Sequence, residues 1–401
     1  MEYIKSNIIK YQDILFPFLD ITLNGANVFY HIFLSFYLSQ STYGIISSLF
    51  SLLAITFVIG IGLQIYTAKK VAENKDENQI SGIFKSSIIV VGIMDLFLIA
   101  GISRLVLLTR SGYTEIVMVI LIFTINSVVG VMRGIMQGKQ EFLKLNISFY
   151  YEVISKILLT FLILPVFNSR FSVLLPLLIG MTIALIHGKI FLGKINIKGS
   201  INLRESIMEI AKISGTQFFL YYFISINMIV VNYKYPQVSG VYGVVGKYSQ
   251  IFVHIGFSII TVIIPKLAEK KEIKQFNNMA KKILIGYVLL GITGLIFYYR
   301  FLPWTVGKVF TKEFHGAADY IFLEGIAYLF IAICFLLINY EILKNRKSYM
   351  LNLLIASSVL TLSLALYSKN LFQAIMIEQI VFSLLALSIY VDLFIRREKD
   401  E

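Results

Sequence analysis

Cysteine and charge are the scarcest features of this sequence. A single cysteine, Cys334, stands among 401 residues, so the chain cannot form an intrachain disulfide. Charged residues make up 15% of the chain, whereas ordinary soluble domains carry about 25%. Hydrophobic residues reach 57%. A chain with so little polar surface cannot cover a water-soluble globule, and we therefore expect an integral membrane protein.

The signatures of common enzyme and metal sites are also missing. The sequence contains no glycine-rich phosphate-binding loop, no HExxH pair and no cysteine cluster, and its four histidines lie on separate segments. The longest expected outer loop, PWTVGKVFTKEFHG, is too short for an extracytoplasmic domain. We therefore expect a transporter and not an enzyme or a nucleotide-driven pump, with no cofactor and no resident metal.

Long apolar runs are abundant. A helix needs about 20 mostly apolar residues to cross a bilayer, and twelve such runs lie between polar breaks. Each run is too long for a strand of a membrane barrel, so the expected fold is all-α. The runs cover residues 13–39, 44–68, 83–108, 115–137, 146–166, 171–193, 207–232, 240–265, 283–302, 317–343, 349–368 and 371–394.

The polar breaks alternate in basic charge. Seven of them, counting both termini, hold 22 lysine and arginine residues, whereas the six others hold 6. By the positive-inside rule we place both termini in the cytoplasm, and the net charge of +13 then needs no nucleic-acid partner to explain it. Lys5 and Lys10 precede the first run, which we interpret as a retained span and not as a cleaved signal peptide.

A repeat divides the chain. A Tyr-Gly pair stands at 43–44 and again at 242–243, and each pair opens an apolar run that ends in a basic tail, KKVAE in the first and PKLAE in the second. The pairs are 199 residues apart, close to half the chain length. We therefore predict two six-helix lobes, 1–200 and 201–401, related by a pseudo-twofold axis along the membrane normal, as in many transporters.

One face of the first run is polar. Its polar residues recur at spacings of three or four, which places them on one side of a helix: Asp20, Asn24, Asn27, His31 and Ser35. A charged side chain at the bilayer centre costs about 2.5–3.5 kcal/mol on insertion scales, so this face should meet water or protein instead of lipid. It either lines a cavity or packs against another helix with its hydrogen bonds satisfied.

Two runs of the second lobe carry similar stripes. The stripe on run 240–265 consists of Lys247, Gln250, His254, Ser258 and Thr261. The stripe on run 207–232 consists of Gln217, Tyr221 and Ser225, with Lys212 near the inner end of the run. If the lobes pack side by side, these faces and the first stripe close around a hydrated chamber. Such a chamber carries carboxylate and ammonium groups, which suits a phosphate or a sugar.

Other polar groups lie inside further runs. Arg133 either extends to lipid headgroups or meets an anionic substrate. Glu152 and Lys156 are four residues apart and are expected to neutralise each other. A ridge of small residues, which allows close helix packing, is formed by Gly130, Gly134 and Gly138. Isolated carboxyls, which are functional candidates without named partners, are Asp95, Glu324 and Glu378.

Two stretches of the chain resemble the polysaccharide biosynthesis flippases. They are FLSFYLSQSTYGIISSLFSLLAITFVIGIGLQIYTAKKVAENK and RGIMQGKQEFLKLNISFYYEVISKI, the second beginning at Arg133. These flippases are O-antigen and capsule repeat-unit transporters of the multidrug/oligosaccharidyl-lipid/polysaccharide exporter superfamily. The resemblance covers residues 1–170 and continues through the second Tyr-Gly block. It implies twelve to fourteen helices in two lobes around a central basic cavity.

The resemblance also implies a function. The expected substrate is an oligosaccharide on undecaprenyl pyrophosphate, moved from the inner to the outer leaflet of a bacterial cytoplasmic membrane, with a polysaccharide polymerase as a partner. Cationic cavity residues of the family meet the pyrophosphate, and we assign this role to Arg133, Lys212 and Lys247. Asp20 and His31 are candidates for coupling transport to Na⁺ or H⁺.

Three alternative functions make different demands on the sequence. A drug or cation exporter of the same superfamily would use Asp20 or Glu378 for a cationic substrate. A membrane-embedded glycan polymerase or acyltransferase would need a sizeable outer loop or a His/Asp catalytic group, and neither is visible. A major-facilitator carrier would place a Gly/Asp/Arg motif between the second and third runs, where this chain has KKVAENKDENQISG.

Overall fold

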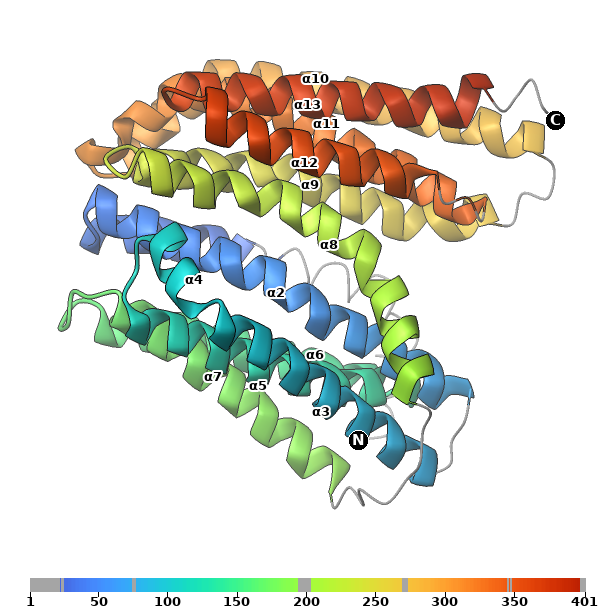
Figure 1. The fold of residues 1–401 in the computed structure, drawn as a ribbon. Coiled ribbons are helices and arrows are strands. Elements are labelled where there is room, and N and C mark those ends of the chain that lie inside the picture. The colour runs from blue at the N-terminus through green and yellow to red at the C-terminus, as the bar shows by residue number, and fades with distance from the viewer. Residues whose placement is uncertain are drawn as a thin grey trace, which may run out of the picture. The chain divides into compact units, whose positions relative to one another are not determined.

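The protein is described by a computed structural model. It covers residues 22, 25–73, 77–193, 203–268, 273–344, 346 and 348–396. Within these ranges the chain forms helices joined by turns and short connections, which confirms the expected all-α class (Figure 1).

The helices follow one another with few residues between them. The first part of the chain contains a helix over residues 25–37, then α2 (Gln40–Glu73), α3 (Glu77–Ala100), α4 (Ile102–Thr109), α5 (Tyr113–Gly138), α6 (Phe142–Ile163) and α7 (Phe171–Leu192). The second part contains α8 (Leu203–Lys234), α9 (Ser239–Ala268), α10 (Ile273–Val309), η1 (Lys312–Ala317), α11 (Ala318–Leu343), α12 (Tyr349–Tyr367), α13 (Leu371–Val391) and η2 (Asp392–Arg396).

Ten of the described helices are long and apolar enough to cross a membrane. Of the other two expected spans, run 240–265 forms helix α9, and run 13–39 lies partly outside the described residues. Large apolar side chains point outward from these helices, among them Leu96, Leu162 and Ile190, the last with 77% of its surface exposed. A helical protein with such an apolar exterior belongs in lipid, and the chain is a multi-pass membrane protein.

Side-chain hydrogen bonds and backbone conformation fix several helix ends. Asn370 accepts a hydrogen bond on Oδ1 from the backbone N–H of Gln373, 2.9 Å away, and so caps the start of α13. Gly193 ends α7 with φ of 66°, a conformation that glycine adopts easily. The Nζ of Lys234 donates to the carbonyls of Ala365 and Ser368 at 2.8 and 2.7 Å, beside the end of α12 where the helix dipole favours a cation.

Contacts divide the chain into two compact units. Unit 1 consists of Met1–Leu38 and Leu52–Phe218, and unit 2 of Ser39–Ser51 and Phe219–Glu401. The division runs through α2 and α8, because the first part of each of these helices packs in one unit and the remainder in the other. The bounds of the units differ from 1–200 and 201–401 by these short helical segments, and the two six-helix lobes stay a prediction.

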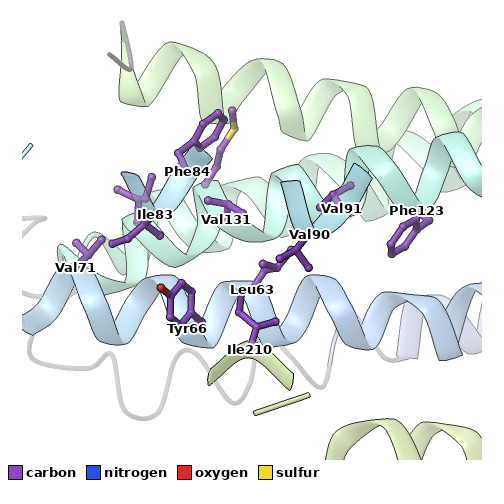
Figure 2. Packing of buried hydrophobic residues seen from close by; sticks show 12 residues of the cluster. Leu63, Tyr66, Val71, Ile83, Phe84, Val90, Val91, Phe123, Val131 and Ile210 are labelled. Atoms are coloured by element: carbon purple, nitrogen blue, oxygen red, sulfur yellow. The ribbon is translucent and has the colours of Figure 1, made fainter. Parts of the chain in front are cut away.

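Unit 1 has a core where α2, α3, α5 and the start of α8 meet. Its buried side chains include Leu63, Tyr66, Val90, Phe123 and Val131 (Figure 2). The ridge of glycines on α5 packs against α2, as the sequence predicts. A methyl group added at Gly134 would lie 2.5 Å from the carbonyl oxygen of Gln64, so only glycine allows this approach.

Unit 2 is organised around α11. This helix packs against α9, α10 and α13, and most of its apolar side chains are buried, including Ile331, Cys334 and Phe335. Cys334 is buried in this apolar environment, and its thiol lies 3.7 Å from the carbonyl oxygen of Phe382.

The two Tyr-Gly pairs contact each other within unit 2. A methyl group added at Gly44 would meet Ser239, one added at Gly240 would meet the carbonyl of Gln40, and one added at Gly243 would meet Tyr43. The start of α2 therefore crosses the start of α9 at a near contact of backbones. This crossing gives the repeated pair a structural reason, because each copy needs glycine where the helices touch.

Helices α3, α4 and α10 have bounds that differ from the expected runs 83–108 and 283–302. The run 83–108 is interrupted at Gly101, so it forms α3 and the short α4. The basic break before run 283–302 is partly helical, because α10 begins at Ile273 and continues through this run. Phe276 is buried and packs edge-on against Tyr340 of α11, with ring centroids 6.3 Å apart. The apolar side of the first turns of α10 therefore packs against other helices of the protein.

Candidate functional site

A buried ion pair lies between α5 and α6 in unit 1. The guanidinium of Arg133 donates to Glu152 Oε2 at 2.8 Å, and the two side chains are only 5% and 17% exposed. Arg133 also donates to the hydroxyl and the carbonyl of Ser148, both at 3.0 Å, and stacks 3.9 Å from the ring of Phe149. Four contacts hold this guanidinium inside the protein, so it does not extend to lipid headgroups.

A second basic residue, Lys156, lies on α6 one turn after Glu152. Lys156 donates from Nζ to Asn27 Oδ1 at 2.6 Å and lies 4.7 Å above the ring of Tyr30. The Tyr30 hydroxyl is 3.4 Å from that of Thr160. These contacts join α6 to the polar face of the helix over residues 25–37.

The partners of Glu152 and Lys156 differ from those expected. We predicted that these two residues would neutralise each other, but Glu152 binds Arg133 and Lys156 binds Asn27. The physical reason is that a buried guanidinium offers a stronger, charge-assisted bond to the carboxylate than a neighbouring ammonium does. This arrangement gives the centre two positive charges and one negative charge. We call Arg133, Glu152, Lys156 and Asn27 the basic centre.

The rest of the first polar stripe has mixed outcomes. His31 is buried and meets Tyr30 edge-on at 5.7 Å, and Ser35 donates to the carbonyl of Ile32 at 2.7 Å. Asp20 and Asn24 lie outside the described residues. Part of the stripe therefore packs against α6, and the cavity-lining role of Asp20 and Asn24 stays a prediction.

The stripes on α8 and α9 are more open. Lys212 and His254 are exposed, and Gln217 and Tyr221 are half-buried. Gln217 belongs to unit 1, whereas Tyr221, one turn later, belongs to unit 2.

On α9, Lys247 donates from Nζ to Gln250 Oε1 at 3.3 Å. Gln250 in turn lies beside Tyr328 of α11. The Tyr328 hydroxyl is 3.2 Å from the carbonyl oxygen of Ile224. The polar face of α9 therefore continues inward to α11.

For two groups of functional candidates, the sequence did not predict the interaction partners. Lys156 was paired with the wrong partner, although its place four residues before Thr160 was a signal that α6 has a polar face. Glu324 and Glu378 were recognised as isolated carboxyls, but no spacing rule connects residues on α11 and α13. The structure brings both carboxyls to the hydroxyl of Tyr242, at 2.8 Å each.

Comparison with known families gives one family match. A family model described as "Polysaccharide biosynthesis protein" matches residues 18–271. No curated protein matches the chain.

Several solved structures are similar over nearly the whole chain. An inward-facing multidrug resistance MATE transporter of the MOP superfamily has a TM-score of 0.74 at 13% identity, covering 93% of this chain and 94% of its own. The lipid II flippase MurJ in an inward closed conformation has a TM-score of 0.74 at 13% identity, with 95% and 87% covered. A MOP superfamily transporter from Pyrococcus furiosus has a TM-score of 0.58 at 11% identity, with 95% and 92% covered. The chain therefore has a transporter fold.

Proposed function

Because the chain belongs to the polysaccharide biosynthesis protein family, we propose that it moves a lipid-linked oligosaccharide from the cytoplasmic to the outer leaflet of a bacterial cytoplasmic membrane. The substrate we propose is a repeat unit of a surface polysaccharide, such as O-antigen or capsule, carried on undecaprenyl pyrophosphate. The fold supports this proposal, because flippases and exporters share it.

The physical problem for such a substrate is its polar head. A sugar chain with a pyrophosphate loses its hydration in hydrocarbon and gains nothing in return, so it cannot cross unaided. A transporter has to give the head polar partners while the polyprenyl tail stays in lipid. Alternating access between an inward and an outward opening provides this path.

The observation that carries the proposal is the charge of the basic centre. Arg133 forms an ion pair with Glu152, whereas the hydrogen-bond partner of Lys156 is the neutral amide of Asn27. A retained cation among apolar helices is costly unless it binds an anion during the working cycle. We propose that Lys156 meets the pyrophosphate, together with the exposed Lys212 and with Lys247.

The gene deletion is the direct test. We expect the deletion strain to accumulate lipid-linked repeat units on the cytoplasmic leaflet and to lose surface polysaccharide. The wild-type gene and Lys85→Met, which changes an exposed lysine of the same unit, should restore export. Lys156→Met should fail to restore it at equal protein level. Normal surface polysaccharide in the deletion strain would refute the proposal.

Two further features belong to the same proposal. The distribution of basic residues supports a cytoplasmic location for both termini, and reporter fusions to each end test this. A polysaccharide polymerase is the partner we propose, because a translocated repeat unit is its substrate. Crosslinking in intact cells that captures no polymerase would remove this partner.

A cation or drug exporter is the second candidate. The buried carboxyls of Glu324 and Glu378 favour it, since carboxylates bind cations, and the fold is shared with MATE exporters. Growth of the deletion strain with cationic compounds separates the candidates. Greater sensitivity together with normal surface polysaccharide would establish the exporter, and unchanged sensitivity with accumulated lipid-linked repeat units would exclude it.

A further inference from the structure

Three helices of unit 2 meet at a pair of buried carboxyls. Glu324 of α11 and Glu378 of α13 are both 0% exposed. The hydroxyl of Tyr242, on α9, lies 2.8 Å from Oε1 of each. Among the residues that the structure describes, neither carboxyl forms an ion pair.

These two distances fit a proton on the carboxyls. The phenol of Tyr242 has one hydrogen, so it can form a linear hydrogen bond with only one carboxyl. An equally good bond on the other side forms when that carboxyl carries a hydrogen and donates it to the phenol oxygen. The arrangement therefore favours a neutral acid at one of the two glutamates.

The surroundings contain acceptors that still lack a hydrogen. Oε2 of Glu324 and Oε2 of Glu378 are buried without a hydrogen-bond partner. Asn227 of α8 lies beside Glu378 and is 1% exposed. Its amide nitrogen donates to the carbonyl of Phe223 at 3.2 Å, and its amide oxygen has no partner. This clustering of unpaired acceptor atoms points to a positively charged ligand, of which the proton is the smallest.

We propose that Glu324, Glu378 and Tyr242 form a site that takes up and releases a proton during the transport cycle, a step that rests on the proposed transport function. In the protonated form, the carboxylic O–H and the phenol O–H join α9, α11 and α13. Release breaks the carboxylic O–H bond, gives the proton to water and leaves two adjacent carboxylates. Two like charges at one apolar site repel each other, so release favours separation of these helices.

The groups that face this site come from each packed helix. They are Asn227 of α8, Tyr242 of α9, Tyr328 of α11 and the two carboxyls themselves. Tyr328 lies one turn from Glu324 and beside Gln250, which accepts a hydrogen bond from Lys247. Tyr328 therefore lies between the carboxyls and the polar face of α9.

Infrared difference spectroscopy on the full chain in lipid nanodiscs tests the proton directly and needs no transport substrate. Between neutral and alkaline pH we expect the loss of a carboxylic acid band that shifts in heavy water. Glu324→Gln and Glu378→Gln should each abolish this band, whereas Glu115→Gln, which removes a carboxylate paired with Arg170, should leave it unchanged. A band that survives in both site variants, or that disappears on adding Na⁺ at constant pH, would overturn the proposal.

Complementation of the deletion strain separates the two proposals. We expect Glu378→Gln to be made at wild-type level and to leave surface polysaccharide export at least tenfold below wild type. Full export by Glu378→Gln would overturn the coupling role and leave the flippase function standing. A deletion strain with normal polysaccharide would remove the flippase function even if the infrared band behaves as expected.

Discussion

The two units bury charge in opposite ways. Unit 1 holds a guanidinium bound to a carboxylate, with a second cation beside it, so its interior is basic. Unit 2 holds two carboxyls around a tyrosine, so its interior is acidic and needs a proton. Both units are built from similar apolar helices, and the sequence repeats its Tyr-Gly pair in each half.

Both copies of the Tyr-Gly pair lie in unit 2, so a similar contrast between side chains also exists within one unit. The glycines of the repeated pair are used in the same way, because the two copies pack against each other. The tyrosines are used differently. Tyr43 packs edge-on against Phe314 with centroids 5.2 Å apart, whereas Tyr242 binds two carboxyls. The two copies therefore make similar glycine contacts, whereas their tyrosines have different partners.

The largest effect should come from neutralising one carboxyl in each unit. Glu152→Gln leaves the guanidinium of Arg133 buried without a counter-ion, and we expect a loss of about 3 kcal/mol, the lower end for a buried pair because Glu152 is 17% exposed. Glu378→Gln removes a carboxyl whose ionised form is unfavourable, so stability should stay equal or rise. Thermal unfolding of both purified variants measures this contrast. Equal losses would show that the units do not differ in this way.

A smaller effect should follow from filling the glycine contact of α5 on α2. In Gly134→Ala, the new methyl group would lie 2.5 Å from the Gln64 carbonyl oxygen, and overpacking of this kind costs about 1–3 kcal/mol. Gly92→Ala is the matched control, since a methyl group there meets nothing within 4 Å. Alanine is the better helix former, so the control should be neutral or more stable. A control as unstable as Gly134→Ala would contradict this.

The sequence predicted the scaffold better than the site. Apolar runs of sufficient length predicted the helices. The four-residue spacing of Gly130, Gly134 and Gly138 predicted the close packing of α5 against another helix. Spacing rules work within one helix, where neighbours are three or four residues apart. They say nothing about which helices meet. The bond of Arg133 to Glu152, and the meeting of Glu324 with Glu378, depend on tertiary packing.

Within unit 2, the role of Tyr242 should appear in a comparison with an exposed tyrosine of the same unit. Tyr242→Phe removes one hydroxyl from between two carboxyls, and we expect a loss of about 1 kcal/mol at neutral pH. Tyr299→Phe changes an exposed tyrosine of α10 that packs against Phe322, and it should stay within about 0.5 kcal/mol of wild type. Unfolding of the two variants under identical conditions gives the comparison. Equal stabilities would mean that the Tyr242 hydroxyl contributes nothing to unit 2.

The smallest effect should come from an ion-pair group of unit 1 that is more exposed than the basic centre. Glu209 of α8 binds Lys69 at 2.7 Å and Lys70 at 3.0 Å, with side-chain exposures of 19%, 54% and 26%. Water screens such pairs and typically limits each to about 1 kcal/mol or less. We expect Glu209→Gln to cost less than 1 kcal/mol and to lose even this in high salt. Glu152→Gln should keep its larger deficit in the same salt, because Arg133 is shielded from solvent. If the two variants respond to salt alike, the basic centre is hydrated and its excess charge carries no special cost.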